Sequence, residues 1–426
     1  MPQHDEAPEW RAAQAVARRS YGKLVAYLSA RTRDVAGAED ALSEAFAAAL
    51  VDWPRHGVPR TPEAWLLTVA RRKMVDAARQ RRSMDGVADT LLVISDLAHE
   101  DEHDTPLPDE RLALMFVCAH PAIAAEARAP LMLQTILGFD AGAIASAFLV
   151  APATMGQRLV RAKTKIRQAG IPFRVPDRAD LAERLQAVLD AIYAAYAEGW
   201  SDPAGTEARR RNLAEEAIWL GRLVASLLPQ EPEALGLLSL MLHAQARRGA
   251  RRDVSGRYVP LAEQDTALWD VPMIDEAESL LLGASALGTI GRFQLEAAVQ
   301  SAHSVRRLTG QADWPAIERL YDALMHLTGS PVVAINRAIA ITETQGPAAA
   351  LAVLDAVAGD ARLADYQPYW AARAGLLERL GDLPAADRAY ELAIGLEADP
   401  AVREFLQQRR NGAHQNAHPN THKNND

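Results

Sequence analysis

The sequence predicts an all-α protein, and two observations support this. Apolar residues recur at helical spacing along almost the whole chain, and alternating runs of β-branched residues are scarce. One clear apolar stripe comprises Leu181, Leu185, Val188, Leu189, Ile192, Tyr193 and Tyr196. The 426 residues, 49% hydrophobic and 24% charged, have the composition of an ordinary globular chain with room for two or three domains.

The sequence also indicates the compartment. No stretch approaches the roughly 18 uninterrupted apolar residues of a membrane span, and the polar, acidic N-terminus does not resemble a secretory signal. The single cysteine, Cys118, cannot form an internal disulfide bond. We therefore expect a cytoplasmic protein without a membrane partner.

The net charge of −9 is distributed unevenly along the chain. Residues 11–82 carry a net charge of +7 and residues 111–174 carry +6, whereas residues 83–110 carry −9. Two basic blocks joined by an acidic segment favour two separate contacts with a polyanion.

The second basic block predicts a helix, a short helix, a turn and a last helix over residues 131–167. Asp140 is expected to cap the short helix, and Pro152 is expected in the first turn of the last one. Helical spacing of about 100° per residue places one set of residues of the last helix in the core: Met155, Leu159, Ala162 and Ile166.

The opposite face of this helix is polar and basic. It comprises Thr154, Gln157, Arg158, Arg161 and Lys165. In a DNA-binding helix-turn-helix, early polar residues contact base edges and later cations contact phosphates. The alternative is a solvated basic helix, which explains poorly why residues 152–174 contain six cations and no acid.

The first basic block contains two informative helices. In residues 38–46 (AEDALSEAF) the acids lie beside an apolar stripe. In residues 61–82, the predicted buried side comprises Leu67, Ala70, Met74 and Ala78. A second stripe comprises Trp65, Val69, Arg72, Asp76 and Arg79. An aromatic ring beside guanidinium groups suits stacking on unpaired bases. The alternative is that Trp65 belongs to the core and Arg72 only pairs with Asp76.

The C-terminal third shows weak repetition. One set of residues has the offsets of a tetratricopeptide helix pair: Trp370, Ala374, Leu377, Gly381, Asp382, Ala386, Tyr390 and Ala393. Gly346, Ala350, Leu354 and Val357 occupy comparable places earlier. Such modules usually bind proteins, and the polar tail 412–426 is expected to be disordered.

These motifs together carry a resemblance. Residues 38–46, a Trp-Pro loop and the stretch AWLLTVARRKMVDAARQRR resemble region 2 of the extracytoplasmic-function (group IV) sigma factors, and the helix-turn-helix resembles their region 4. The stretches CAHPAI, FLVAPATMGQRLVRAKTKIRQAGIPFRVP and SPVVAINRAIA resemble the subgroup with a C-terminal tetratricopeptide-like extension. The resemblance covers residues 12–410. It implies region 2 over 1–82, an acidic linker over 83–107, region 4 over 108–171 and the extension over 172–411.

The resemblance implies specific partners. Glu39, Asp40 and Glu44 are expected to dock on the β′ clamp helices of RNA polymerase core, with the β flap as a further contact. The loop 51–60 and the helix 61–82 are expected to capture flipped bases of the promoter −10 element. The residues for this are His56, Arg60, Trp65, Arg72, Lys73, Asp76 and Arg79. The helix 152–168 is expected to bind the −35 element, and the extension to bind a protein partner.

The sequence departs from the family pattern at two positions. Ser43 stands where Gln is frequent, and Arg72 stands where Asn is frequent.

Two other functions stay open. One is a helix-turn-helix regulator with a tetratricopeptide sensor that does not bind core polymerase. The other is a metallohydrolase, because residues 99–103 (HEDEH) match the zinc motif H-E-x-x-H. That motif lies in an acidic, proline-flanked segment, so we expect no enzymatic activity, no metal and no cofactor.

The extension allows two hypotheses. Its net charge of −10 over residues 175–426 could cover the basic faces, or it could be a packed part of the working protein. The junction QAGIPFRVP leaves little flexible linker before the amphipathic helix at Leu181. That helix needs a partner surface, and the region 4-like segment is the nearest one. We therefore expect packing, and the subgroup resemblance implies a required extension.

Overall fold

The structure, a computed structural model, describes residues 8–85, 108–148, 150–200 and 208–417. Over these ranges it contains α-helices, short 3₁₀ helices and one isolated bridge between Arg252 and Tyr258, and no β-strand, which confirms the all-α prediction. Among the described helices, none is both long and apolar enough to cross a membrane. The chain forms two compact units, residues 1–200 with 212–217, and residues 201–211 with 218–426.

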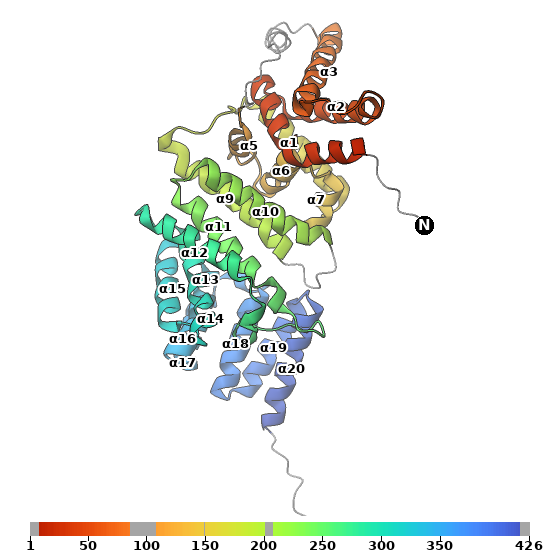
Figure 1. Cartoon of the computed structure of the whole chain (residues 1–426). Helices are drawn as coiled ribbons and strands as arrows, with labels where there is room; N and C mark the ends of the chain where they lie inside the picture. Colours follow the sequence, from red (N-terminus) through yellow and green to blue (C-terminus); the bar gives the residue numbers. More distant parts are fainter. Residues whose placement is uncertain (1–7, 86–107, 149, 201–207, 418–426) are drawn as a thin grey trace, which may run out of the picture. The chain divides into compact units, whose positions relative to one another are not determined.

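The first unit begins with three mutually packed helices (Figure 1). These are α1 (Pro8–Thr32), α2 (Val35–His56) and α3 (Pro62–Asp85). Asp34 caps α2 by accepting a hydrogen bond from the Gly37 amide at 3.1 Å. Leu67, Ala70 and Met74 are buried as predicted, together with Leu66, whereas the side chain of Ala78 lies outside the described part. The apolar periodicity therefore identified the inner side of α3.

The predicted loop 51–60 is largely helical, so this prediction was wrong. Helix α2 continues through Pro54 to His56, and only residues 57–61 connect it to α3. The side chain of Trp53 is buried, and the Gly57 amide donates to the Trp53 carbonyl at 2.8 Å. Gly57 then ends the helix with a φ of 85°, a conformation that glycine adopts without strain. A buried tryptophan thus outweighs the helix-breaking tendency of the next residue, Pro54.

Four further helices follow the segment 86–107, which contains most of the predicted acidic linker and lies outside the described residues. They are α5 (Arg111–Cys118), α6 (Ala125–Leu137), α7 (Ala141–Ala147) and α8 (Pro152–Gln168). The Ala143 amide donates to the Asp140 carboxylate at 2.8 Å, and Pro152 starts α8, as predicted. The buried residues of α8 are Met155, Leu159, Ala162 and Ile166, which confirms the predicted core face.

The N-terminal three helices share their core with this second group. Helix α1 packs against both α5 and α6. The approach to α6 is close, because a Cβ added at Gly22 would lie 2.1 Å from the Ile136 carbonyl oxygen. A larger residue at position 22 would therefore push the two groups apart.

Helix α9 (Arg178–Trp200) completes the first unit by packing on α5 and α6. Leu185, Val188 and Leu189 are buried in it, and the Arg184 guanidinium donates to the Phe116 carbonyl at 3.2 Å. The expected packing of the amphipathic stripe on the segment 108–171 is confirmed. The compact unit consequently extends to residue 200, beyond the expected boundary at 171.

The second unit starts within α10 (Ala208–Leu227). It continues with α11 (Pro232–Ala246), α12 (Val271–Ala286), α13 (Arg292–Ser304) and the single-turn α14 (Arg306–Thr309). Helix α11 packs on both α12 and α13. The Glu233 carboxylate caps α13 by accepting from the Phe293 and Gln294 amides at 3.0 and 3.1 Å. A long connection, residues 247–270, joins α11 to α12.

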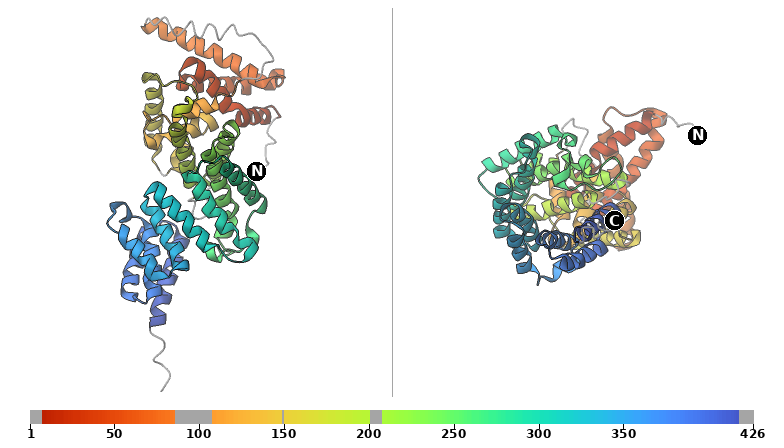
Figure 2. Two further views of the ribbon diagram at one scale, coloured as in Figure 1. Left: turned by 90° about the vertical axis from the view of Figure 1, so that its left-hand side faces the viewer. Right: turned by 90° about the horizontal axis from the view of Figure 1, so that it is seen from below.

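The rest of the second unit is a series of helices in which each packs on the next (Figure 1 and Figure 2). They are α15 (Trp314–Thr328), α16 (Pro331–Thr344), α17 (Pro347–Val357), α18 (Gln367–Leu380), α19 (Leu383–Leu396) and α20 (Pro400–Ala417). The residues at repeat offsets that are buried include Ala350, Leu354, Ala374, Leu377, Ala386, Tyr390 and Ala393, whereas Trp370 is half-buried.

Helix α20 also corrects the expected start of the tail. It extends to Ala417, whereas disorder was expected from residue 412. Leu406 and Ala413 are buried seven residues apart on one face, and the Arg410 guanidinium pairs with Asp387 at 2.5 Å. These contacts with α19 hold a segment whose composition is otherwise polar.

Candidate nucleic-acid interface

Helix α8 presents a basic face to solvent. Thr154, Gln157, Arg161 and Lys165 are exposed and Arg158 is half-buried, each on the side opposite the buried residues. Within the described part of the chain, no carboxylate forms an ion pair with Arg158, Arg161 or Lys165. Three cations without an internal counter-ion along one helix face are suited to phosphate contacts.

Lys163, on the same helix, has a different environment. Its ammonium group pairs with the carboxylate of Glu39 from α2, and both side chains are largely buried where the two helices pack. Burial raises the pKa of the Glu39 carboxyl, while the Lys163 charge opposes that rise. Sequence analysis missed this pair, because the two residues are 124 positions apart.

The burial of Glu39 corrects its expected exposure on a docking face. Only 6% of Glu39 is exposed, so it is not accessible to another protein in this conformation. Glu39 is adjacent to Asp40 on α2, but α8 packs against the side of α2 that carries Glu39. A docking role for Glu39 would require α8 to move away.

Asp40 and Glu44 are exposed one turn apart on α2. The Glu44 carboxylate lies 2.9 Å from the Lys73 ammonium of α3, and this hydrogen bond raises the pKa of Lys73. A residue expected to bind the polymerase thus pairs with one expected to bind DNA. Exposed pairs of this kind contribute little to stability, so either partner can be drawn to another ligand.

The aromatic residue of the first basic block lies at the surface. Trp65 is half-buried, and its ring packs edge-on against the buried Trp53 with centroids 5.7 Å apart. Arg72 and Asp76 are both exposed on α3. The Trp53 contact fixes the orientation of Trp65 and leaves part of it accessible.

The remaining predicted −10 residues are placed as follows. His56 lies at the end of α2 with Nδ1 2.9 Å from the Asp52 carboxylate, and Arg60 is exposed in the connection 57–61. Asp76 is exposed on α3, and the side chain of Arg79 lies outside the described part. The exposed residues of this set come from the end of α2, the connection and one side of α3.

Sequence analysis also missed a cation–aromatic cluster in the first unit. The Arg71 guanidinium donates to the Tyr27 hydroxyl at 2.7 Å, and the Arg31 guanidinium lies 3.6 Å from the Tyr27 ring centroid. The signal was present as arginines on α1 and α3, but their convergence on one buried tyrosine depends on how the two helices pack.

Two other candidates from the sequence are Cys118 and the motif at residues 99–103. Cys118 is buried with its sulfur 3.5 Å from the Thr135 hydroxyl, and burial raises the pKa of its thiol to about 12. Cys118 is therefore a packed residue of the core. In the described ranges no cluster of His, Cys, Asp or Glu could hold a metal ion, and residues 99–103 lie outside them.

Comparison with known proteins identifies two segments. Residues 16–84, which span α1 to α3, match the Sigma-70 region 2 family. Residues 184–285, from α9 to α12, match a family of unknown function, DUF6596. The Sigma-70 match supports a sigma factor role in transcription initiation, which implies binding to RNA polymerase core.

One relative matches over nearly the full length. An uncharacterised protein of Rhizobium meliloti (strain 1021), R00370, is 39% identical over 394 residues, which are 90% of this chain and 91% of the relative. No solved structure matches the chain.

Proposed function

The chain belongs to the same family as R00370 of Rhizobium meliloti, and on that basis and its Sigma-70 region 2 we propose that it is an extracytoplasmic-function sigma factor. It binds polymerase core, directs it to specific promoters and carries a tetratricopeptide-like C-terminal extension. The observation that carries this proposal is the Sigma-70 region 2 match over α1 to α3.

The −35 element is assigned to α8. Gln157 and Arg158 on its basic face are residue types that bind base edges. Arg161 and Lys165 follow them on the same face and are assigned to phosphate contacts. Arg158, Arg161 and Lys165 form no ion pair with a carboxylate of the described chain. This supports the assignment, because cations with a structural role would have carboxylate partners.

The −10 element is assigned to α3 and the connection before it. The accessible part of Trp65 offers a stacking surface for an extruded base, and Arg72 and Arg60 are exposed cations for its backbone. Core polymerase is assigned to the exposed Asp40 and Glu44 of α2. Glu39 joins them only after the Glu39–Lys163 contact opens.

The extension is proposed to be a required part of the sigma factor. Its first helix, α9, covers α5 and α6, so the helix-turn-helix segment depends on it for a complete core. The stacked helical pairs α15 to α20 are the proposed surface for a protein partner, as in other helical-repeat proteins.

Run-off transcription with purified core polymerase and the full chain, on a random promoter library, tests the proposal. We expect transcripts that start a fixed distance downstream of two enriched elements, and none of these with core alone. DNA binding without any core-dependent transcription would instead identify a helix-turn-helix regulator. A variant with Arg158→Ala is expected to lose the enrichment at one −35 position while keeping the −10 preference.

A further inference from the structure

The second unit contains a cavity of about 720 Å³ that the proposed function does not use. Its walls come from the connection 258–269, from α13 and α14, from the connection 310–312, and from α15 and α16. This volume lies in the range of about 300–1,000 Å³ that is usual for small-molecule sites. The cavity lies wholly within one compact unit, so its shape does not depend on the first unit.

The walls are rich in aromatic rings. Trp269 from the connection before α12, Trp314 at the start of α15 and Tyr321 from α15 all line the cavity. Trp314 packs edge-on against the His303 ring with centroids 5.5 Å apart, and Trp269 is 3% exposed. Rings held in place by such contacts offer flat apolar surfaces at little entropic cost.

The electrostatics of the cavity favour an anion. Among the described residues that line it, none is an aspartate or glutamate, whereas Arg306 is one of them. The Arg306 guanidinium donates to the backbone carbonyls of Leu261 and Gln264 and forms no ion pair with a carboxylate in the described chain. Its hydrogen bonds are thus made to neutral groups, and its charge stays uncompensated beside the cavity.

A second arginine reinforces this potential. Arg247 is buried, and the guanidinium carbons of Arg247 and Arg306 lie 5.8 and 5.5 Å from the Trp269 ring centroid. Burial, followed by these two arginine charges, lowers the pKa of His303 to about 4. His303 is therefore neutral at pH 7, and the positive charge of the site belongs to the arginines.

Neutral hydrogen-bonding groups complete the lining. Gln300 from α13, Gln311 from the following connection and Asn336 from α16 contribute side-chain amides. Amides both donate and accept, so they can bind polar substituents without adding charge. Aromatic walls, an uncompensated arginine and a few amides together define one chemical class of ligand.

We propose that this cavity binds a small planar aromatic carboxylate, with its ring between the Trp269 and Trp314 walls and its carboxylate directed to Arg306. Guanidinium groups bind carboxylates with matched geometry, and aromatic rings pack well on tryptophan. The site is separate from the surfaces that the proposed function assigns to DNA and polymerase.

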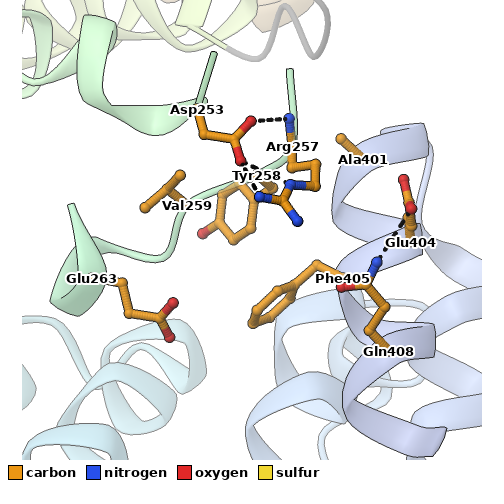
Figure 3. Close-up of a pocket in the computed structure, with 9 residues that line it drawn as sticks. All are labelled: Asp253, Arg257, Tyr258, Val259, Glu263, Ala401, Glu404, Phe405 and Gln408. Carbon is orange, nitrogen blue, oxygen red and sulfur yellow. Dashed lines mark hydrogen bonds and ion pairs between the residues drawn. The ribbon is translucent and has the colours of Figure 1, made fainter. Parts of the chain in front are cut away.

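A neighbouring pocket provides a contrast within the same unit. It has a volume of about 260 Å³ and is lined by three carboxylates, from Asp253, Glu263 and Glu404 (Figure 3). Its Arg257 is already bound by Asp253 at 2.7 Å, as the dashed lines in Figure 3 show. Tyr258 there packs edge-on against Phe405 of α20 with centroids 5.5 Å apart. This acidic pocket should not accept an anion, so it supplies a control position.

Isothermal titration of the full chain with naphthalene-2-carboxylate and with its neutral counterpart naphthalene-2-carboxamide tests the proposal. We expect saturable binding of the carboxylate and at least tenfold weaker binding of the amide. Tryptophan fluorescence should report the same ordering, since two tryptophans line the cavity. Absence of saturable binding, or equal affinity for the two probes, would overturn the proposal.

Three single-residue variants test whether the ligand binds in this cavity. Arg306→Lys keeps the charge but loses the forked geometry and should weaken carboxylate binding at least tenfold. Ile339→Trp fills the cavity from a residue that is 45% exposed, so it should abolish binding without disturbing the core. Glu404→Gln, in the acidic pocket, should leave binding unchanged. Circular dichroism checks each fold, and full binding by the folded Ile339→Trp variant would contradict this location.

Discussion

The basic face of α8 and the arginines around Trp269 use the same kind of charge in opposite ways. On the basic face of α8, Arg161 and Lys165 are exposed and Arg158 is half-buried, and none of the three has a carboxylate partner in the described chain. In the second unit, Arg247 and Arg306 converge on one tryptophan from positions 59 residues apart, and Arg306 donates to backbone carbonyls. Exposed charge of the first kind follows from helical spacing alone, whereas the second kind exists only once the helices have packed.

Two lysines of α8 show the same contrast between a charge used in packing and an exposed charge. Lys163 and Lys165 are two residues apart, yet Lys163 is half-buried against Glu39 and Lys165 is exposed. A rotation of about 200° around the helix axis separates them. Charge on the same helix therefore serves packing on one side and is available to a ligand on the other.

The largest effect is expected from truncation after Pro176. This removes α9 and uncovers the sides of α5 and α6 on which it packs. Each fully buried large apolar side chain stabilises a protein by about 1.5–3 kcal/mol, and α9 buries several, including Leu185, Val188 and Leu189. The truncated chain should unfold at lower temperature and direct less promoter-specific transcription.

Truncation after Trp200 is the matched control, because it keeps α9 and removes the rest. It should unfold at a higher temperature than the shorter chain. Thermal unfolding and run-off transcription at equal concentrations of folded protein compare the two. A soluble Pro176 truncation with markedly higher activity than the full chain would instead support autoinhibition by the acidic extension.

The two lysines of α8 provide the next test. Lys163→Ala leaves the buried Glu39 carboxyl without its cation, and breaking such a pair costs about 3 kcal/mol. Lys165→Ala removes an exposed charge, so the free energy of unfolding should change by less than about 0.5 kcal/mol. Urea unfolding of both variants measures the difference. Equal stability of the two would mean that the contact between α2 and α8 contributes nothing in solution.

The buried histidines of the second unit predict a pH dependence. Burial, and then the Arg247 and Arg307 charges, lower the pKa of His243 from 6.5 to about 4. The Glu278 carboxylate lies 3.6 Å from the His243 Nε2 atom. Below pH 6.5 the unfolded chain takes up the proton while the folded protein does not, so stability falls from pH 6.5 down to about 4.

At about 1.4 kcal/mol for each unit of pKa, His243 should account for about 3 kcal/mol of that loss. The variant His243→Asn keeps a hydrogen-bonding group near Ser304 and should show a shallower decline between pH 6.5 and 4.5 in urea unfolding. His303 should titrate in the same direction in both proteins. An unchanged slope would show that His243 is accessible to protons in the folded state.

Much of the first unit could be predicted because its side chains follow helical periodicity. All four predicted core residues of α8 are buried, Asp140 caps the short helix α7, and Pro152 lies in the first turn of α8. The exceptions involve packing partners from distant positions. Pro54 predicted a loop, but the buried Trp53 keeps α2 helical to His56. Glu39 was expected at the surface, but Lys163 and the packing of α8 cover it. In the second unit, no local pattern identifies the cavity, since its walls come from segments up to about 80 residues apart.

A smaller effect is expected for specificity on α8. Arg158→Ala should weaken binding to the preferred −35 sequence by about 1–3 kcal/mol and relax the preference at one base pair. Lys165→Ala should weaken binding to every sequence and reduce the slope of log K against log salt by about 1. Fluorescence anisotropy with promoter duplexes of varied sequence and salt separates the two effects. Identical behaviour of the variants would mean that α8 is oriented differently on DNA.

The most direct test of the sigma factor assignment is the affinity of the full chain for purified RNA polymerase core. Reversal of both exposed acids on α2, Asp40→Arg with Glu44→Arg, should weaken binding more than tenfold. Reversal of two exposed acids on α9, Asp180→Arg with Glu183→Arg, changes the net charge equally and should leave the affinity within about twofold. A core affinity that is unchanged by the α2 reversal, or no binding of core by the unaltered chain, would contradict the assignment.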